Sequence, residues 1–200
     1  MKAIVVGATG TIGREVTKVL EKAGYEVIAA SRNTSAKADI ENENSLDKLL
    51  KDAGKVDVIV SAAGYAAFGE LNKLSGEDFQ RSLNSKLMGQ VNLARKGLPN
   101  LNPGGTILLT GGIFGHKPWP GTAAIAMVNT ALEGFIRAAA LETDENKKVL
   151  LIHPPLVAET AGAMGMDTSA YLPAAEVAKS YLEAINKGES GVPFFIQDKN

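Results

Sequence analysis

Three glycines near the N-terminus have the spacing of a loop that binds a diphosphate. They lie in Gly7-Ala8-Thr9-Gly10-Thr11-Ile12-Gly13, directly after the apolar residues 3–6. A tight turn favours residues without a Cβ, and a helix beginning there would offer its free N–H groups to an anion. The sequence predicts a dinucleotide site, although such glycines can also serve a βα turn by packing alone. The expected contacts are Gly7, Thr9, Gly10, Thr11, Ile12 and Gly13.

The end of the second apolar segment indicates which dinucleotide binds. NAD sites commonly place an acidic residue there, about 20 residues beyond the glycines, to hold the ribose hydroxyls. Here the segment ends in Ala29-Ala30-Ser31-Arg32, and no carboxylate follows before Asp39. Arg32 could present its planar guanidinium to a 2′-phosphate, with Ser31 as a short donor beside it. We therefore expect NADP(H) rather than NAD(H); the alternative is that Arg32 is a solvated surface residue.

Two loop side chains are candidate proton donors. His116 and Tyr65 each follow an apolar, strand-like segment, and both side chains can act as acids in an active site. The alternative is that His116 is an exposed loop residue and Tyr65 a half-buried one. Lys86 is expected to face solvent. No metal site is predicted, because the chain has no cysteine and its two histidines, His116 and His153, lie far apart in sequence.

Strand-like and helix-like segments alternate along the chain and would position these residues. Strands are expected over residues 2–6, 25–30, 56–61, 106–110, 148–152 and 192–196. Helices are expected over residues 13–23, 44–53, 75–98, 122–142 and 173–187. This pattern predicts an α/β fold, with a doubly wound, mostly parallel sheet of about seven strands (a Rossmann fold) between two helical layers. The ligand crevice of such a sheet lies at the carboxyl ends of its strands, and residues 158–172 are expected to form a flap over it.

Composition limits the remaining possibilities. The chain has 200 residues, of which 45% are hydrophobic and 22% charged, and these proportions are those of a single globular domain over residues 1–200. The net charge of −1 gives no electrostatic reason to expect nucleic acid or an anionic membrane surface as a partner. No segment has the length of a membrane span, so the cytoplasm is the expected compartment.

These features together resemble a short-chain dehydrogenase/reductase over nearly the whole chain. Asp39-Ile40 resembles the Asp–apolar pair that holds the adenine edge in that family, and Ser61-Ala62-Ala63-Gly64 resembles the Asn-Asn-Ala-Gly motif beside the cofactor ribose. Asn84 resembles the helix asparagine whose backbone holds a water for the proton relay. Pro154-Pro155-Leu156-Val157, with Thr160, resembles the stretch that touches nicotinamide. The resemblance therefore implies cofactor contacts from Asp39, Ile40, Ala62, Ala63, Gly64, Pro154, Leu156 and Val157.

The catalytic trio of that family does not carry over. Its members use a serine and a Tyr-x-x-x-Lys pair, and the Glu133-Gly134-Phe135 tail of the matching segment sets the register. In that register the tyrosine falls on Ile125, the lysine on Asn129 and the serine on Gly112. Ile125 cannot donate a proton, whereas Asn129 can still bond a ribose hydroxyl. The resemblance therefore implies cofactor binding without the usual acid–base groups.

Three functions are compatible with this combination. The first is an NADP(H)-dependent oxidoreductase that acts on a small carbonyl-like substrate with a non-standard proton donor, for which Asn84, His116 and Tyr65 are the candidate residues. The second is a catalytically silent NADP(H)-binding sensor or scaffold. The third is a lyase or isomerase that uses the crevice without net oxidation. Because helix 122–142 is apolar nearly all round, and family members are dimers or tetramers, a homodimer or homotetramer through helices 75–98 and 122–142 is also expected.

Overall fold

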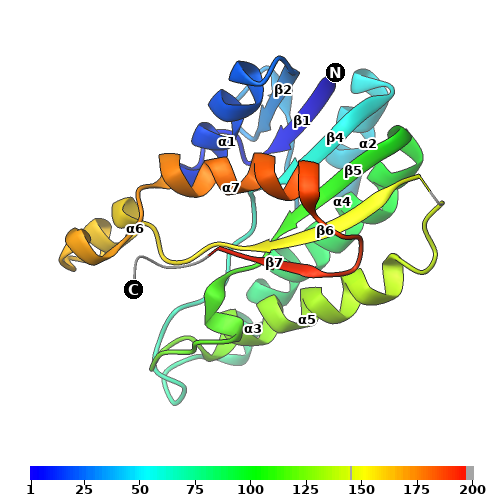
Figure 1. The fold of residues 1–200 in the computed structure, drawn as a ribbon. Helices are drawn as coiled ribbons and strands as arrows, with labels where there is room; N and C mark the ends of the chain where they lie inside the picture. Colours follow the sequence, from blue (N-terminus) through cyan, green and yellow to red (C-terminus); the bar gives the residue numbers. More distant parts are fainter. Residues whose placement is uncertain (145, 197–200) are drawn as a thin grey trace.

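A seven-stranded parallel sheet forms the centre of the molecule (Figure 1), a computed structural model that describes residues 1–144 and 146–196. Every pair of neighbouring strands is parallel. The strands are β1 (Lys2–Val6), β2 (Glu26–Ser31), β3 (Ala36–Lys37), β4 (Val56–Ser61), β5 (Leu101–Thr110), β6 (Lys148–His153) and β7 (Pro193–Phe195). Their order is β3-β2-β1-β4-β5-β6-β7, so the direction of winding reverses between β1 and β4. The predicted doubly wound sheet is confirmed, and the crevice beside this reversal is where ligands of such sheets bind.

Helices cover both faces of the sheet, because successive side chains of β1 point to opposite sides. Val5 lies in one core with side chains of α1 (Thr11–Lys22) and α7 (Ala174–Lys187). Ile4 lies in the other, with side chains of α2 (Glu43–Ala53), α4 (Gly89–Gly97) and α5 (Ala123–Ala139). Figure 1 shows α1 and α7 together on one side of the sheet and α5 on the other. The three-layer arrangement expected from the alternating pattern is confirmed.

The predicted helices and strands are present with shifted ends. The first helix begins at Thr11 rather than at residue 13, so Gly10 precedes its first turn. Helix α5 ends at Ala139, before the predicted residue 142, and β5 begins at Leu101, ahead of the predicted residue 106. The short strand β3 pairs with the end of β2 and lies in a segment that was expected to be a loop. The predicted single domain includes residues 145 and 197–200, which lie outside the described residues.

The helix predicted over residues 75–98 contains a change of helical type. Its start is confirmed by a capping box between Ser75 and Asp78 at the head of α3 (Gly76–Ser82). A π-helical turn, Leu83–Met88, then connects α3 to α4. Wide turns of this kind occur mostly as local insertions, frequently at functional sites. This one changes which side chains of the segment face the crevice.

The side chain of Gln90 anchors this turn to the end of β5. Its amide nitrogen donates to the carbonyl oxygens of Lys86 (3.0 Å) and Thr110 (2.9 Å), and its amide oxygen accepts from the Thr110 N–H at 2.8 Å. Gln90 is fully buried, so these bonds form away from water, where an unpaired amide would be costly. The π-helical turn is thereby fixed beside the carboxyl end of the sheet.

The predicted flap, residues 158–172, contains two short helical segments. It contains α6 (Ala158–Ala163) and a 3₁₀ turn, Thr168–Ala170, and a single β-bridge joins Val157 to Leu172. The Glu159 carboxylate accepts from the N–H of Ala174 at 2.9 Å and so satisfies a free donor in the first turn of α7. In the described part of the chain, no helix is long and apolar enough to cross a membrane.

Candidate active site

The glycine turn after β1 is a cradle that side chains would fill. Gly7 has φ +89°, and a Cβ there would lie 2.6 Å from the Ala62 carbonyl oxygen. A Cβ on Gly13 would overlap the carbonyl oxygen of Gly7. Helix α1 starts at this turn with no side-chain cap and no acidic residue in its first turn. Its N–H groups and positive dipole end therefore remain available to an anion, and these residues fit a dinucleotide diphosphate.

A cavity of about 340 Å³ extends from this cradle across the ends of β1, β2 and β4. Eleven of the seventeen lining residues are predicted cofactor contacts or the predicted proton donor Tyr65. They are Gly7, Thr9, Gly10, Ser31, Arg32, Asp39, Ile40, Ala62, Ala63 and, shared with the next cavity, Gly64; Tyr65 is the eleventh predicted residue on this wall. Arg32 is exposed, and no ion pair to it is found in the described part of the chain. This arrangement leaves a guanidinium open at the far end of the cavity.

Arg81 is a second cation on the wall of this cavity. Its guanidinium carbon lies 4.3 Å from the centre of the Tyr65 ring, within the range of a cation–π contact. The Tyr65 N–H donates to the Ser85 hydroxyl at 3.0 Å, which fixes the loop after β4 to the π-helical turn. Tyr65 therefore lines the cofactor-side cavity and is not among the residues that line the second one.

The second cavity, of about 230 Å³, adjoins the first at Gly64. Six predicted cofactor contacts line it: Ile12, Gly64, Asn129, Pro154, Leu156 and Val157. Thr11 and Gly13 lie in α1 next to the cradle and line neither cavity. The two cavities together follow the carboxyl ends of β1, β4, β5 and β6, the edge at which a dinucleotide lies in this type of sheet.

The three positions assigned to the missing catalytic trio converge on this second cavity. Gly112, Ile125 and Asn129 all line it, as the register of α5 predicts. The Asn129 side-chain nitrogen donates to the Gly112 carbonyl oxygen at 3.2 Å, while its side-chain oxygen is buried without a hydrogen-bond partner in the described part of the chain. Neither Gly112 nor Ile125 offers a side-chain proton donor to this wall.

Lys86 is the ionisable side chain on the wall of the second cavity, and the expectation that it faces solvent is wrong. Burial lowers the pKa of Lys86 from its usual 10.5 to about 8. A Cβ on Gly64 would lie 3.0 Å from the Lys86 Cα and Cδ, so the glycine, with φ +124°, gives the lysine stem room. An ammonium group with this pKa can both hold and release a proton near neutral pH.

Asn84 lies on the opposite side of the same segment. It is exposed, its side-chain oxygen accepts from Gln80 at 2.8 Å, and it lines none of the crevice cavities. Its backbone carbonyl accepts from the Gly89 N–H within the π-helical turn. Residues two apart on a helix differ by about 200°, so only one of Asn84 and Lys86 can face the crevice. The structure places Lys86 there and turns the Asn84 side chain away, so the role predicted for the Asn84 backbone stays a prediction.

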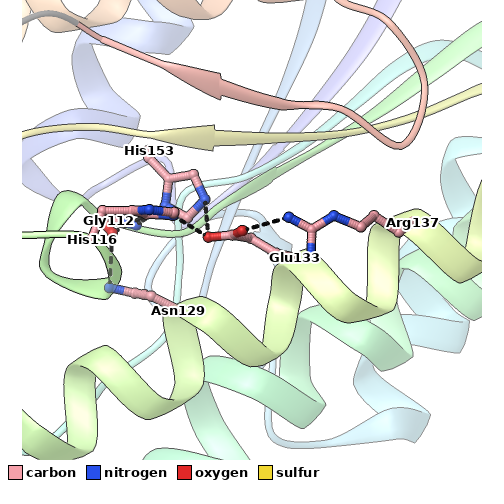
Figure 2. Close-up of polar contacts among 6 residues, drawn as sticks. All are labelled: Gly112, His116, Asn129, Glu133, Arg137 and His153. Carbon is pink, nitrogen blue, oxygen red and sulfur yellow. Dashed lines mark hydrogen bonds and ion pairs between the residues drawn. The ribbon is translucent and has the colours of Figure 1, made fainter.

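His116 belongs to a different group of side chains (Figure 2). Its Nε2 contacts Oε1 of Glu133, whose other oxygen accepts from Arg137 at 2.8 Å. The ring centroids of His116 and His153 are 5.5 Å apart, which corrects the view that the two histidines are too distant to act together. Burial lowers the pKa of His153, and its Nδ1 lies 3.0 Å from the Gly112 carbonyl oxygen. This cluster lies behind the Gly112 wall, and His116 does not line the crevice cavities.

A third cavity, of about 220 Å³, extends the crevice beyond the second. The two share Ile113, Phe114 and Leu156. Trp119 and Tyr171 line its outer part, and the Phe114 and Trp119 rings meet edge to face with centroids 4.8 Å apart. This aromatic wall is suited to an apolar or planar group of a substrate.

Comparisons with known proteins agree with this geometry. Residues 1–170 match the short chain dehydrogenase family. The chain is 30% identical over 136 residues to the trihydroxynaphthalene reductase PfmaI of Pestalotiopsis fici, an overlap of 67% of this chain and 47% of that protein. It is 28% identical over 210 aligned residues to carbonyl reductase family member 4 of Danio rerio, covering 90% and 89% of the two chains. The chain spans about half the length of the two naphthalene reductases it matches first, 47% and 50%.

Two solved structures are similar over almost the whole chain. The protein lin1944 of Listeria innocua is 34% identical with a TM-score of 0.92, covering 98% of this chain and 100% of that one. A small-chain dehydrogenase in complex with NADPH is 29% identical with a TM-score of 0.87, covering 98% and 96%. With the family match over residues 1–170, the chain belongs to the short chain dehydrogenase family of oxidoreductases.

Proposed function

We propose that this protein is an NADP(H)-dependent reductase of a small carbonyl compound in which Lys86 delivers the proton. The observation that carries the proposal is the position of Lys86. It lines a cavity that adjoins the dinucleotide cradle at Gly64, and burial brings its pKa to about 8. The reductase names of the relatives support the same direction of reaction.

The choice of NADP(H) is supported by the charges along the first cavity. Arg32 and Arg81 both line this cavity, and either guanidinium can pair with a phosphate. The Ser31 hydroxyl accepts from the Asn33 N–H at 3.1 Å, which shapes the turn that carries Arg32. Asp39 lies on the same wall and holds the Glu41 N–H at 3.1 Å through its carboxylate. The similar dehydrogenase whose complex contains NADPH is consistent with this choice.

The chain's own contribution to the chemistry would be a proton and a dry, oriented site. When bound, the reduced dinucleotide supplies a hydride to the carbonyl carbon. The negative charge that develops on the carbonyl oxygen must then be neutralised, and the Lys86 ammonium can transfer a proton from Nζ to that oxygen. Lys86 is left as a neutral amine, which burial favours, and takes up a proton from water before the next cycle.

Lys86 is preferred over the other candidate donors because of their positions. Tyr65 lies beside the first cavity under Arg81, His116 is paired with Glu133 behind the Gly112 wall, and Asn84 is exposed on the other side of its helix. Lys86 alone among these four lines the cavity that also holds Gly112 and Asn129. A side chain must come within hydrogen-bond reach of the reacting oxygen to act as a general acid.

The test is to mix the protein and NADPH with a panel of aldehydes, ketones and quinones. Turnover is monitored as the loss of the reduced nicotinamide. A positioned acid contributes roughly 10²–10⁴-fold, so Lys86→Met should lower kcat by that factor while NADPH affinity is unchanged. Lys73→Met, which removes an exposed lysine paired with Glu70, is the matched control and should keep full activity. Reduction by the unaltered protein should decline above pH 8, as Lys86 loses its proton.

Two results would contradict the proposal. The absence of NADPH binding in calorimetry would remove the cofactor assignment. Full activity of Lys86→Met, with the same pH profile, would remove Lys86 as the acid. Lys86→Arg separates charge from acidity, because a guanidinium stays protonated at all accessible pH values and is expected to bind substrate without restoring proton transfer.

We also propose that the protein forms a homodimer or homotetramer through the outer faces of α4 and α5. Met88, just before α4, and Met127 of α5 are 43% and 40% exposed, and both are large apolar side chains. A two-fold arrangement would cover such residues with their own copies. Light scattering of the unaltered protein and of Met127→Glu should show an oligomer in the first and a monomer in the second; two monomers would contradict this assignment.

A further inference from the structure

We propose that His116, Glu133 and His153 form a binding site for a divalent transition-metal ion such as Zn²⁺. The three side chains come from separate elements: the turn after β5, the middle of α5 and the end of β6 (Figure 2). Their potential ligand atoms all lie within 4.8 Å of one another. Two imidazoles and one carboxylate are a ligand set that Zn²⁺ commonly takes in proteins.

The spacing of the buried pair matches a tetrahedral site. His153 Nε2 lies 3.4 Å from Glu133 Oε1. Two ligands on a tetrahedral Zn²⁺, each at about 2.0–2.1 Å, are themselves about 3.3–3.4 Å apart. His116 Nε2 contacts the same Glu133 oxygen and lies on a surface turn, so a small rotation of its side chain would bring it to the same separation.

The surroundings of His153 point its Nε2 lone pair toward the cluster. The ring is fully buried, and Nδ1 lies 3.0 Å from the Gly112 carbonyl oxygen, to which an Nδ1–H can donate. In that tautomer Nε2 has no proton and faces the carboxylate of Glu133. Among the described residues, Nε2 has no hydrogen-bond partner. A histidine held by a backbone carbonyl through one nitrogen and free at the other has the arrangement typical of a metal ligand.

Neighbouring residues supply the outer contacts that such a site requires. Arg137 holds Glu133 Oε2 at 2.8 Å and leaves Oε1 to face the two histidines. The Phe195 ring stacks on His153 with centroids 4.9 Å apart, which orients the buried imidazole, and it meets His116 edge to face at 4.6 Å. Contacts of this kind orient ligands and commonly change metal affinity by about 10–100-fold.

A simple ion pair accounts for only part of the arrangement. A shared proton can join His116 to Glu133, but it leaves the buried Nε2 of His153 directed at the same oxygen without a partner. A divalent cation would satisfy both imidazoles and the carboxylate together. The His116 side chain is 41% exposed, so an ion could reach the site from solvent and keep a fourth, water-filled position.

Metal binding here would stiffen one wall of the candidate active site. In the tautomer that leaves Nε2 free, His153 donates from Nδ1 to the Gly112 carbonyl oxygen at 3.0 Å, and Asn129 donates to the same carbonyl at 3.2 Å. The metal site and the crevice therefore lie on the two sides of one backbone segment. The role assigned to the ion is structural, and it does not depend on the proposed reductase activity.

The test uses the untagged full chain and Zn²⁺ alone, titrated against a chromophoric chelator and checked by elemental analysis after dialysis. One Zn²⁺ per chain is expected. His116→Ala removes a surface ligand and should weaken binding more than about 100-fold, whereas Arg137→Gln removes an outer contact and should weaken it about 10–100-fold. Asp167→Asn, an acidic residue on an exposed turn, is the control and should bind like the unaltered protein.

Two outcomes would overturn the site. One is no stoichiometric Zn²⁺ in the unaltered protein; the other is equal affinity in His116→Ala and the unaltered protein. His153 is fully buried, so a variant at this position could fail to fold. A spectrum of the Co²⁺-loaded protein is therefore the second measurement in place of a His153 variant. Tetrahedral Co²⁺ should give visible absorption bands that disappear in His116→Ala, and an octahedral spectrum in the unaltered protein would also contradict the site. NADPH enters neither measurement, so a failure here leaves the reductase proposal in place.

Discussion

Replacing Lys86 with methionine is expected to stabilise the fold while it removes turnover. Burial lowers the Lys86 pKa from 10.5 to about 8, with desolvation as the cause. Each pKa unit corresponds to about 1.4 kcal/mol, so keeping the ammonium in this position costs at most about 3 kcal/mol at pH 7. Methionine has a similar length and no charge, and it can occupy the same path beside Gly64 without that cost.

The pH dependence of this gain follows from the sign of the shift. The unfolded chain binds the Lys86 proton more tightly than the folded one, so stability rises with pH through this group. The unfavourable contribution is complete below pH 8 and disappears as the pH approaches 10.5. Lys86→Met should therefore be more stable than the unaltered protein by up to about 3 kcal/mol at pH 7, and by less than about 1 kcal/mol at pH 10.

Urea unfolding of both proteins at the two pH values measures this difference directly. Other titrating groups are shared and cancel in the comparison. Lys73→Met, at an exposed pair with Glu70, should differ from the unaltered protein by less than about 0.5 kcal/mol at either pH. A Lys86→Met protein that is less stable at pH 7, or whose gain is the same at pH 7 and pH 10, would refute the desolvated ammonium on which the proposed mechanism rests.

Three further predictions concern the cofactor cradle and the metal cluster. Arg32→Ala should weaken NADPH binding at least about 10-fold and leave NADH binding unchanged in calorimetry; equal losses for both would show that Arg32 does not read the 2′-phosphate. Gly13→Ala should lower the unfolding free energy by about 1–3 kcal/mol and weaken the dinucleotide site, since its Cβ would overlap the Gly7 carbonyl, whereas Gly134→Ala, which meets open space in a helix, should stabilise by about 0.5–1 kcal/mol. Zn²⁺ at 100 times its dissociation constant should raise the unfolding free energy by about 2.7 kcal/mol, or the melting temperature by about 5–10 °C, and a chelator should reverse this; a melting temperature insensitive to both would contradict the site.

Local sequence patterns were sufficient to predict the sheet and the cofactor cradle. Residues 3–6 are apolar on both faces, and the following glycines are required where a Cβ would meet Ala62 or Gly7. The constraint between Gly13 and Gly7 acts over a few residues, so the local pattern displays it, whereas the contact of Gly7 with Ala62 joins the ends of two strands far apart in sequence. The register set by Glu133-Gly134-Phe135 likewise placed Ile125 and Asn129 on one wall, because residues four apart share a helix face, while Gly112 was placed there by the spacing that the family resemblance implies.

Two features of the candidate site depend on information that local patterns lack. The prediction for Asn84 came from its resemblance to the family's helix asparagine, and Lys86, two residues away, was therefore expected on the solvent side; the π-helical turn Leu83–Met88 is not visible in the sequence pattern. The position of this turn is set by Gln90, which bonds Lys86 within the same helical segment and Thr110 at the end of β5. The gathering of His116 and His153 around Glu133 joins three elements through tertiary packing, and sequence distance carries no information about it.

Gly112, which the family resemblance aligns with the serine, lies where the neighbouring side chains leave no room for a Cβ. A Cβ on Gly111 would lie 2.6 Å from the His153 ring, and a Cβ on Gly112 would lie 2.9 Å from the Asn129 amide. His153 needs this space to reach the Gly112 backbone, and Asn129 needs it to hold the same carbonyl. Gly112, Asn129 and the buried His153 are thus coupled by packing at one segment. In the proposed mechanism the proton comes from a different wall of this crevice, which Lys86 on the π-helical turn occupies.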